Sequence, residues 1–280
     1  MGASKRKAGK AQGGDEKKVK TDIHKIGKYL PGGFPIDPKM KGVMVTCARG
    51  KETQAGREAC DLLSEYADKL YGPILDDNPT GAENEESIED AIAREVAQAK
   101  KAKGGRQFLT LTTGTDCVIF IRAMEIEPSE LCHYALSDLQ RSGNKRTRYC
   151  QRFIPVDETS YANMDDIQVM MDRVLKPYFH AEGQKPTTFK VIPKIRYNDK
   201  IDREVLVKTL ATSVGRGEKH TVNLNSPEYV ILAEVIKSIC FLSVVKDYEG
   251  LKKYNIQSIF EATKQGETET EGADKSEGDK

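Results

Sequence analysis

The chain has 280 residues, of which 38% are hydrophobic and 31% are charged, and its formal net charge is +1. This length suits one large domain or two modest ones with tails. No apolar run approaches the ~20 residues that cross a bilayer, and the basic N-terminus lacks an apolar segment, so we expect no membrane span, no membrane partner and no secretory signal.

The small net charge conceals an uneven distribution. Residues 1–20 carry +5, residues 76–95 carry −7 and residues 261–280 carry −4, which leaves +7 for the remaining chain. The acidic residues are concentrated in segments that we expect to be peripheral, so the folded part is basic. A basic folded part favours a polyanionic partner.

Residues 1–38 are predicted to be a disordered basic tail and linker, because they are rich in Lys, Gly and Ala and end in a turn-rich stretch. The KRK and KKVK clusters within them suit either a nuclear import signal or a plain solubilising tail. We expect the protein in the nucleus or nucleolus, with the cytoplasm as a further location.

Residues 39–142 are predicted to form a ferredoxin-like domain with an acidic insertion at 72–105. Hydrophobic periodicity predicts helices at 53–70 and 128–142. Strands are expected at 42–48, 108–113, 117–123 and 146–154. The order strand, helix, strand, strand, helix, strand is the ferredoxin-like plan, an α+β fold.

A second α+β unit follows, and the THUMP domain named below is assigned to residues 143–259. Its predicted helices are 162–175 and 200–214, and its predicted strands are 188–197, 220–224, 229–236 and 240–245. Residues 260–280 are rich in Glu, Thr, Gly and Lys and are predicted to be a disordered acidic tail.

The stretch KRTRYCQRFIPV, residues 145–156, places four cations before an apolar run. In a strand, alternation would put Arg146, Arg148, Cys150 and Arg152 on one face. The other face would carry Tyr149, Gln151 and Phe153. Arginines two residues apart stand ~6.6 Å apart along a strand, which suits a row of phosphates. The alternative is an ordinary solvated sheet face.

The segment FKVIPKIRY, residues 189–197, repeats this pattern. Lys190, Lys194 and Arg196 share one parity, and mainly apolar residues share the other. In TCARGKE, residues 46–52, the cations Arg49 and Lys51 precede a helix N-terminus, which is a natural seat for a phosphate. It is not a P-loop, because the required Gly and Ser or Thr are absent. The candidate RNA-binding residues are therefore Lys145, Arg146, Arg148, Arg152, Lys190, Lys194, Arg196, Arg49, Lys51 and Lys219.

Six cysteines are scattered without a CxxC pair, and four histidines accompany them, so we expect no metal site. Cys150 lies among arginines that would lower the pKa of its thiol. No motif pairs it with a base, and a passive thiol is favoured. We expect no catalytic residue and no cofactor.

The arrangement of RTRYCQRFIPV, FKVIPKIRYN and HTVNLNSPEYVILAEVIKSICFLSVV, with VTCARGKE upstream, resembles the THUMP-domain tRNA acetylation adaptors. The resemblance covers most of the chain outside the tails and the acidic insertion. It implies a non-catalytic tRNA-binding protein that presents serine and leucine tRNAs to a separate RNA cytidine acetyltransferase, which acetylates a cytidine in the D arm.

Two other functions stay open from the sequence. THUMP domains are often fused to RNA-modifying enzymes, but the chain ends soon after the THUMP unit and shows no GxGxxG motif, so an enzyme is not expected. A general RNA-binding or ribosome-assembly factor fits composition and charge as well as the adaptor does. Only the resemblance separates the two.

Overall fold

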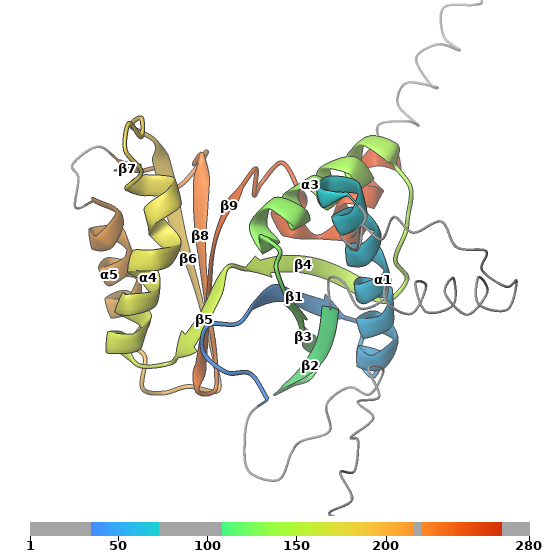
Figure 1. Ribbon diagram of the computed structural model, residues 1–280, viewed down its shortest axis with the longest axis horizontal. Coiled ribbons are helices and arrows are strands. Elements are labelled where there is room, and N and C mark those ends of the chain that lie inside the picture. Colours follow the sequence, from blue (N-terminus) through green and yellow to red (C-terminus); the bar gives the residue numbers. More distant parts are fainter. Residues whose placement is uncertain (1–34, 73–107, 216–219, 265–280) are drawn as a thin grey trace, which may run out of the picture.

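The computed structural model describes residues 35–72, 108–215 and 220–264. They form two β-sheets, each with helices on one face, and the sheets meet at an angle in the centre of the molecule (Figure 1). The predicted basic tail up to residue 34, nearly all of the acidic insertion, Lys219 and the acidic tail from residue 265 lie outside the described residues.

The first unit has the predicted ferredoxin-like architecture. Its antiparallel sheet has the order β2-β3-β1-β4. Its helices are α1 (Glu52–Tyr71) and α3 (Pro128–Ser142). Its strands are β1 (Lys41–Cys47), β2 (Phe108–Thr115), β3 (Val118–Ala123) and β4 (Cys150–Val156).

Local chemistry explains the bounds of α3, which are those that the sequence predicts. Pro128 fills the first turn, where its missing N–H leaves no helical hydrogen bond unmade. Gly143 ends the helix in the left-handed region, at φ 65°, and its N–H donates to the Leu139 carbonyl at 3.1 Å. One face of α3 packs with α1 over the sheet.

The second unit is a five-stranded sheet with helices on one face, and the predicted α+β class is confirmed. The strand order is β5-β9-β8-β6-β7, with β6 parallel to β8. The helices α4 (Met164–Phe179) and α5 (Arg203–Gly215) cover the face that points away from the first unit (Figure 1). The strands are β5 (Glu158–Tyr161), β6 (Thr188–Arg196), β7 (Thr221–Val222), β8 (Tyr229–Ile236) and β9 (Ile239–Lys246).

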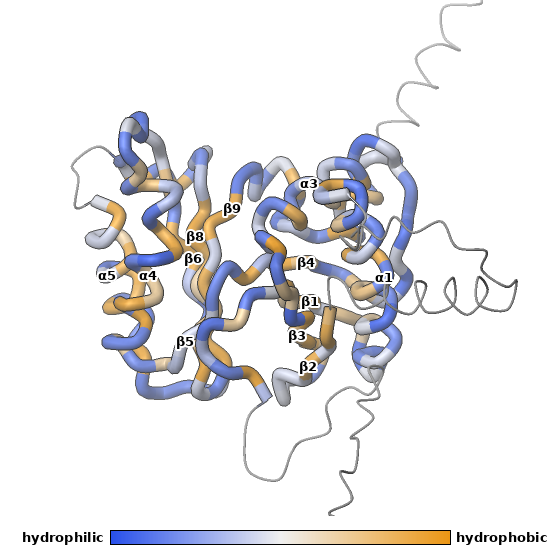
Figure 2. The backbone as a smooth tube through the Cα atoms, viewed as in Figure 1, coloured by the Kyte–Doolittle hydropathy of each residue, from blue (hydrophilic) through white to orange (hydrophobic). Residues whose placement is uncertain are grey.

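The two units share apolar contacts. The inner face of β8 and β9 packs against the first unit, and Figure 2 shows the apolar centre of β8 between the two layers. Phe120 of β3 and Phe241 of β9 meet edge to face, with ring centroids 5.6 Å apart. The relative placement of the sheets therefore rests on side-chain packing as well as on the chain connection.

The chain returns to the first unit after β9, which was not predicted from the sequence. Tyr254, in the short 3-10 helix η1 (Lys252–Tyr254), is fully buried in the core beneath α1 and α3. Residues 256–264 are helical, so ordered structure passes the boundary that was placed at residue 260. Figure 1 shows this orange-red segment beside α3.

The strand β4 differs from its prediction. It begins at Cys150 rather than at residue 146, and residues 143–147 have no regular structure. It pairs with β1 in the first sheet, whereas the predicted domain boundary lay at residue 142. The chain passes from the first sheet to the second between β4 and β5. The strand β5 was not predicted.

Candidate nucleic-acid interface

The cationic segment before β4 is fixed to helix α1 by one carboxylate. Glu58 accepts hydrogen bonds from three successive backbone N–H groups, those of Arg148, Tyr149 and Cys150. Successive amides that point to one place make a site for an anion, and here an internal carboxylate fills it. The segment is therefore a clamped loop that presents its side chains, not a free strand end.

Arg146 is engaged in an ion pair with α1. Its guanidinium donates to both carboxylate oxygens of Glu65, at 2.5 and 3.3 Å. Hydrogen bonds from Arg146 and then from Lys69 lower the pKa of Glu65 to about 2. Arg146 helps to fix the loop, and its contact with RNA stays a prediction.

Two predicted cations that are far apart in sequence meet across one aromatic ring. The Lys51 ammonium lies 5.8 Å from the centroid of the Tyr149 ring, and the Arg148 guanidinium lies 5.3 Å from it. Arg49 stands exposed in the turn just before Lys51. We call Arg49, Lys51, Arg148 and Tyr149 the loop patch.

Lys145 lies apart from this patch. Its ammonium is 5.6 Å from the ring centroid of Phe260, on the C-terminal helix. Lys264 approaches the same ring at 4.9 Å. The first cation of the stretch is thus placed by a part of the chain that was predicted to be disordered.

The predicted face assignment in β4 is wrong for Cys150. Cys47 pairs with Cys150 but Thr46 pairs with Arg152, so Gln151 is an extra residue in a β-bulge. The bulge resets the alternation. Cys150 points with Phe153 into the core beneath the helices, and Arg152 lies on the opposite face.

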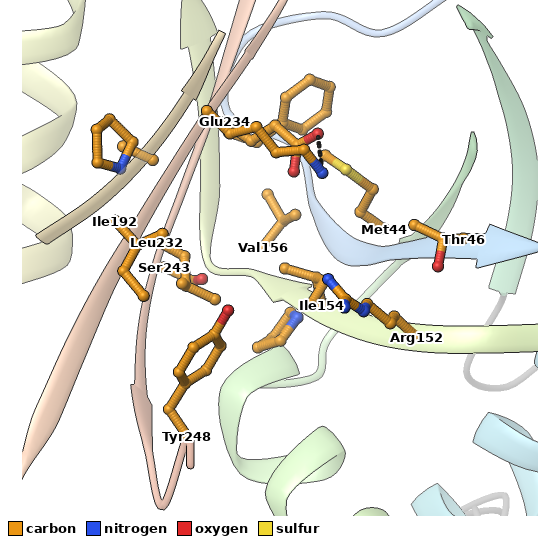
Figure 3. Close-up of a pocket in the computed structure, with 15 residues that line it drawn as sticks. Met44, Thr46, Arg152, Ile154, Val156, Ile192, Leu232, Glu234, Ser243 and Tyr248 are labelled. Carbon is orange, nitrogen blue, oxygen red and sulfur yellow. Dashed lines mark ion pairs between the residues drawn. The ribbon is translucent and has the colours of Figure 1, made fainter. Parts of the chain in front are cut away.

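Arg152 lies on the face of β4 that looks towards the second sheet. It reaches into the space between the sheets, which Glu234 of β8 and Tyr248, just after β9, also line (Figure 3). On β6 the predicted alternation is confirmed, because Phe189, Val191 and Ile195 pack under the helices and Ile192 packs towards the first unit.

Lys194 lines this space with Arg152, and it shares the carboxylate of Glu234 with a third predicted cation, Arg196. Oε1 of Glu234, on β8, lies 3.5 Å from Nζ of Lys194 and 3.2 Å from Nε of Arg196. Desolvation lowers the pKa of Lys194, which is half exposed, while Glu234 opposes this shift. We call Arg152, Lys194, Arg196 and Glu234 the cleft group.

The remaining predicted cation of β6 takes another direction. Nζ of Lys190 donates to the Leu224 carbonyl at 3.0 Å, beyond the cleft group. The predicted residues therefore fall into the loop patch and the cleft group, with Lys145, Arg146 and Lys190 outside both. Four residues in or beside these sites were not predicted as site residues, namely Glu58, Tyr149, Glu234 and Tyr248. Glu234 could have been found, since it interrupts the apolar strand YVILAEVI.

The two cysteine thiols at the pairing of β4 with β1 are not activated. Burial raises the pKa of Cys150, and the nearby Glu58 carboxylate raises it further, opposite to the effect expected from neighbouring arginines. Burial also raises the pKa of Cys47 to about 12. Among the described residues, no group of His, Cys, Asp and Glu could hold a metal ion, and no helix is long and apolar enough to cross a membrane.

Comparison with known proteins gives consistent matches. Residues 161–245 match the family model described as the THUMP domain. The chain is 35% identical to THUMP domain-containing protein 1 of Bos taurus, over 90% of this chain and 73% of that protein. It is 29% identical to the Saccharomyces cerevisiae protein named tRNA acetyltransferase TAN1, over 83% of this chain and 89% of that protein. The solution structure of the THUMP domain of THUMP domain-containing protein 1 is 33% identical, covers 30% of this chain and 84% of that chain, and gives a TM-score of 0.27.

Proposed function

Because the chain belongs to the THUMP domain-containing protein 1 family, we propose that it is a tRNA-binding protein that acts as a non-catalytic adaptor. It presents serine and leucine tRNAs to a separate RNA cytidine acetyltransferase, which acetylates a cytidine in the D arm. It works in the nucleus or nucleolus.

The observation that carries RNA binding is the cleft group. Arg152 comes from the first sheet and Lys194 from the second, and both line one space, while Arg196 pairs with the same Glu234 carboxylate as Lys194. Three cations against the single carboxylate of Glu234 leave a net charge of +2 there. Such a surface attracts the phosphate backbone of RNA, and guanidinium groups fit phosphate oxygens well.

The adaptor role is consistent with the chemistry of the described cysteines. Within the described residues, the cysteines that have a shifted pKa have it raised, which disfavours the nucleophilic thiolate. A covalent acetyl-cysteine intermediate on these thiols is therefore disfavoured. The name of the yeast relative includes acetyltransferase, so the experiment must compare the isolated chain with the pair.

We would test the proposal with purified chain, purified RNA cytidine acetyltransferase, acetyl-CoA and serine tRNA. Acetylcytidine should form only when both proteins are present. Arg152→Ala with Lys194→Ala should reduce both tRNA binding and acetylation. Lys176→Ala, on the exposed surface of α4, is the control and should reduce neither. Acetylcytidine formed by the chain alone would overturn the adaptor assignment.

The preference for serine and leucine tRNAs over other RNAs requires a separate measurement. RNA crosslinked to the protein in cells should be enriched in these two tRNA families over other tRNAs and over ribosomal RNA. Equal recovery of ribosomal RNA would favour the general RNA-binding or ribosome-assembly factor instead.

A further inference from the structure

A cavity of about 200 Å³ lies where the two sheets meet. Its walls come from β1, β4, β6, β8 and β9, and its sides are apolar over much of their area (Figure 3). The cavity is partly open, and one water needs only ~10–15 Å³ of volume measured in the same way. A space of this size at the junction of two sheets is therefore a candidate binding site.

Ser243 is a polar group without a partner in this cavity. On β9, the residues that face the first unit are Ile239, Phe241, Ser243 and Val245, so the serine interrupts an apolar row. It is 1% exposed, and its Oγ has no hydrogen-bond partner among the residues that the structure describes. A buried polar group left unpaired destabilises the fold, and a ligand that makes a hydrogen bond with it would relieve that cost.

Glu234 is a second polar residue that lines this cavity. It interrupts the matching row of β8, between Leu232 and Ile236. Its Oε1 atom is buried and lies near Lys194 and Arg196 as an ion-pair partner, but makes no hydrogen bond to a described residue. The carboxylate is thus balanced in charge while one acceptor position stays unused.

The remaining lining groups fit the other parts of a nucleotide. Arg152 and Lys194 carry positive charge at the cavity, and Tyr248 offers an aromatic ring. Cations suit a phosphate, and aromatic rings stack on bases. A carboxylate accepts hydrogen bonds from an exocyclic amino group, as cytosine and adenine carry and uracil lacks.

We propose that this cavity holds one unstacked nucleotide of the bound RNA, with an amino-bearing base directed to Glu234 and Ser243 and its phosphate on Arg152 and Lys194. The inference rests on the proposed RNA-binding function and adds a base-reading site to it. A free nucleotide would share this chemistry, so the experiment separates the two sources.

The test uses full-length protein with labelled methyl groups, observed by NMR. Ile154, Ile192 and Leu232 line the cavity and report its occupancy directly. Short oligonucleotides of cytidine, of uridine and of abasic backbone are added in turn, and then cytidine monophosphate. We expect the cytidine oligonucleotide to shift these methyl signals and to bind about tenfold more tightly than the other two, because only it can donate an amino group to Glu234.

A pair of matched variants supplies the second arm. Ser243→Leu should fill the cavity and remove the unpaired hydroxyl, so it should weaken cytidine oligonucleotide binding about tenfold without lowering the melting temperature. Ser238→Leu makes the same change at an exposed position of the same β8–β9 hairpin and should have no effect. Ser243→Ala, which adds no volume, should weaken binding less.

The outcomes separate this inference from the proposed function. If tRNA binds while the cavity methyl signals stay unchanged, the base-reading site is wrong and the adaptor proposal stands. If cytidine monophosphate saturates the cavity and the oligonucleotides do not enter it, the site serves a free nucleotide and the inference is overturned. If neither tRNA nor oligonucleotide binds, the proposed function fails as well.

Discussion

Oε2 of Glu58 accepts a hydrogen bond of 2.9 Å from the backbone nitrogen of Tyr149. These residues are 91 positions apart, and the same carboxylate also receives the amides of Arg148 and Cys150. One acidic side chain of α1 thereby holds the end of the cationic loop, where β4 begins, and fixes the backbone of Tyr149.

A hydrogen bond to a charged group typically contributes ~1.5–3 kcal/mol, and less where water reaches it. Because Glu58 is partly exposed, we expect Glu58→Ala to lower the free energy of unfolding by an amount near the lower end of this range. The same change should weaken tRNA binding, since the loop patch loses its support. Glu58→Gln keeps an acceptor and should have a smaller effect on both. Thermal melting and tRNA titration measure the two effects, and an unchanged melting temperature for Glu58→Ala would refute the clamp.

Lys51→Ala combined with Arg148→Ala tests the loop patch. Both side chains are exposed, so their removal leaves no cavity. The melting temperature of the double variant should therefore stay unchanged. The affinity for tRNA should fall about tenfold, which corresponds to ~1.4 kcal/mol. The slope of log affinity against log salt should become shallower by about 0.7–0.9 for each phosphate that the variant no longer neutralises. Lys176→Ala is the control, and an unaltered slope in the double variant would exclude these cations from phosphate binding.

Phe153→Ala and Arg152→Ala test the two faces of β4. Phe153 is fully buried, so its truncation should destabilise the fold by ~3–5 kcal/mol. Arg152 faces the cleft, so its truncation should mainly reduce tRNA affinity. Denaturant unfolding beside tRNA titration separates the two results. A severe loss of stability in Arg152→Ala with normal RNA affinity at low temperature would show that this arginine is structural.

Asp157 predicts a pH effect at the junction of the sheets. Its carboxyl accepts hydrogen bonds from the Ser129 hydroxyl at 2.7 Å and from the Val244 amide at 3.0 Å. Burial nevertheless raises its pKa from 3.8 to about 6, against the opposing effect of these bonds. The folded protein therefore holds this proton more tightly than the unfolded chain does.

The sign of the pH effect follows from that difference. Below about pH 4 the carboxyl is protonated in both states, and its full contribution to the free energy of unfolding is present. This contribution falls as the pH rises through about 6, by roughly 3 kcal/mol at most. Asp157→Asn should remove this part of the pH dependence, because an amide does not titrate. Ser129→Ala removes a hydrogen bond to the ionised form and should move the loss to higher pH. Unfolding measured from pH 4 to pH 7 checks both, and parallel curves for Asp157→Asn and the natural chain would contradict the shift.

Much of the fold was determined by the sequence alone. The bounds of α3, the extent of α1 within a residue at each end and the strand β8 follow from local features, namely apolar periodicity, a proline start and a glycine end. The ferredoxin-like order of the first unit follows from the succession of these elements. The cationic face of β6 was also predictable, because that strand has no bulge and its alternation runs unbroken.

The tertiary structure alone decided how the cations are grouped. The bulge at Gln151 depends on the pairing between β4 and β1. Because of this bulge, Arg152 and Cys150 lie on opposite faces of the sheet, whereas strict alternation would place them on the same face. The loop patch needs Glu58 to hold Arg148 beside Lys51, and the cleft group needs two sheets to meet at a particular angle. These contacts join residues far apart in the chain, so local periodicity carries no information about them. For the same reason, the return of Tyr254 to the core beneath α3 became visible only in the fold.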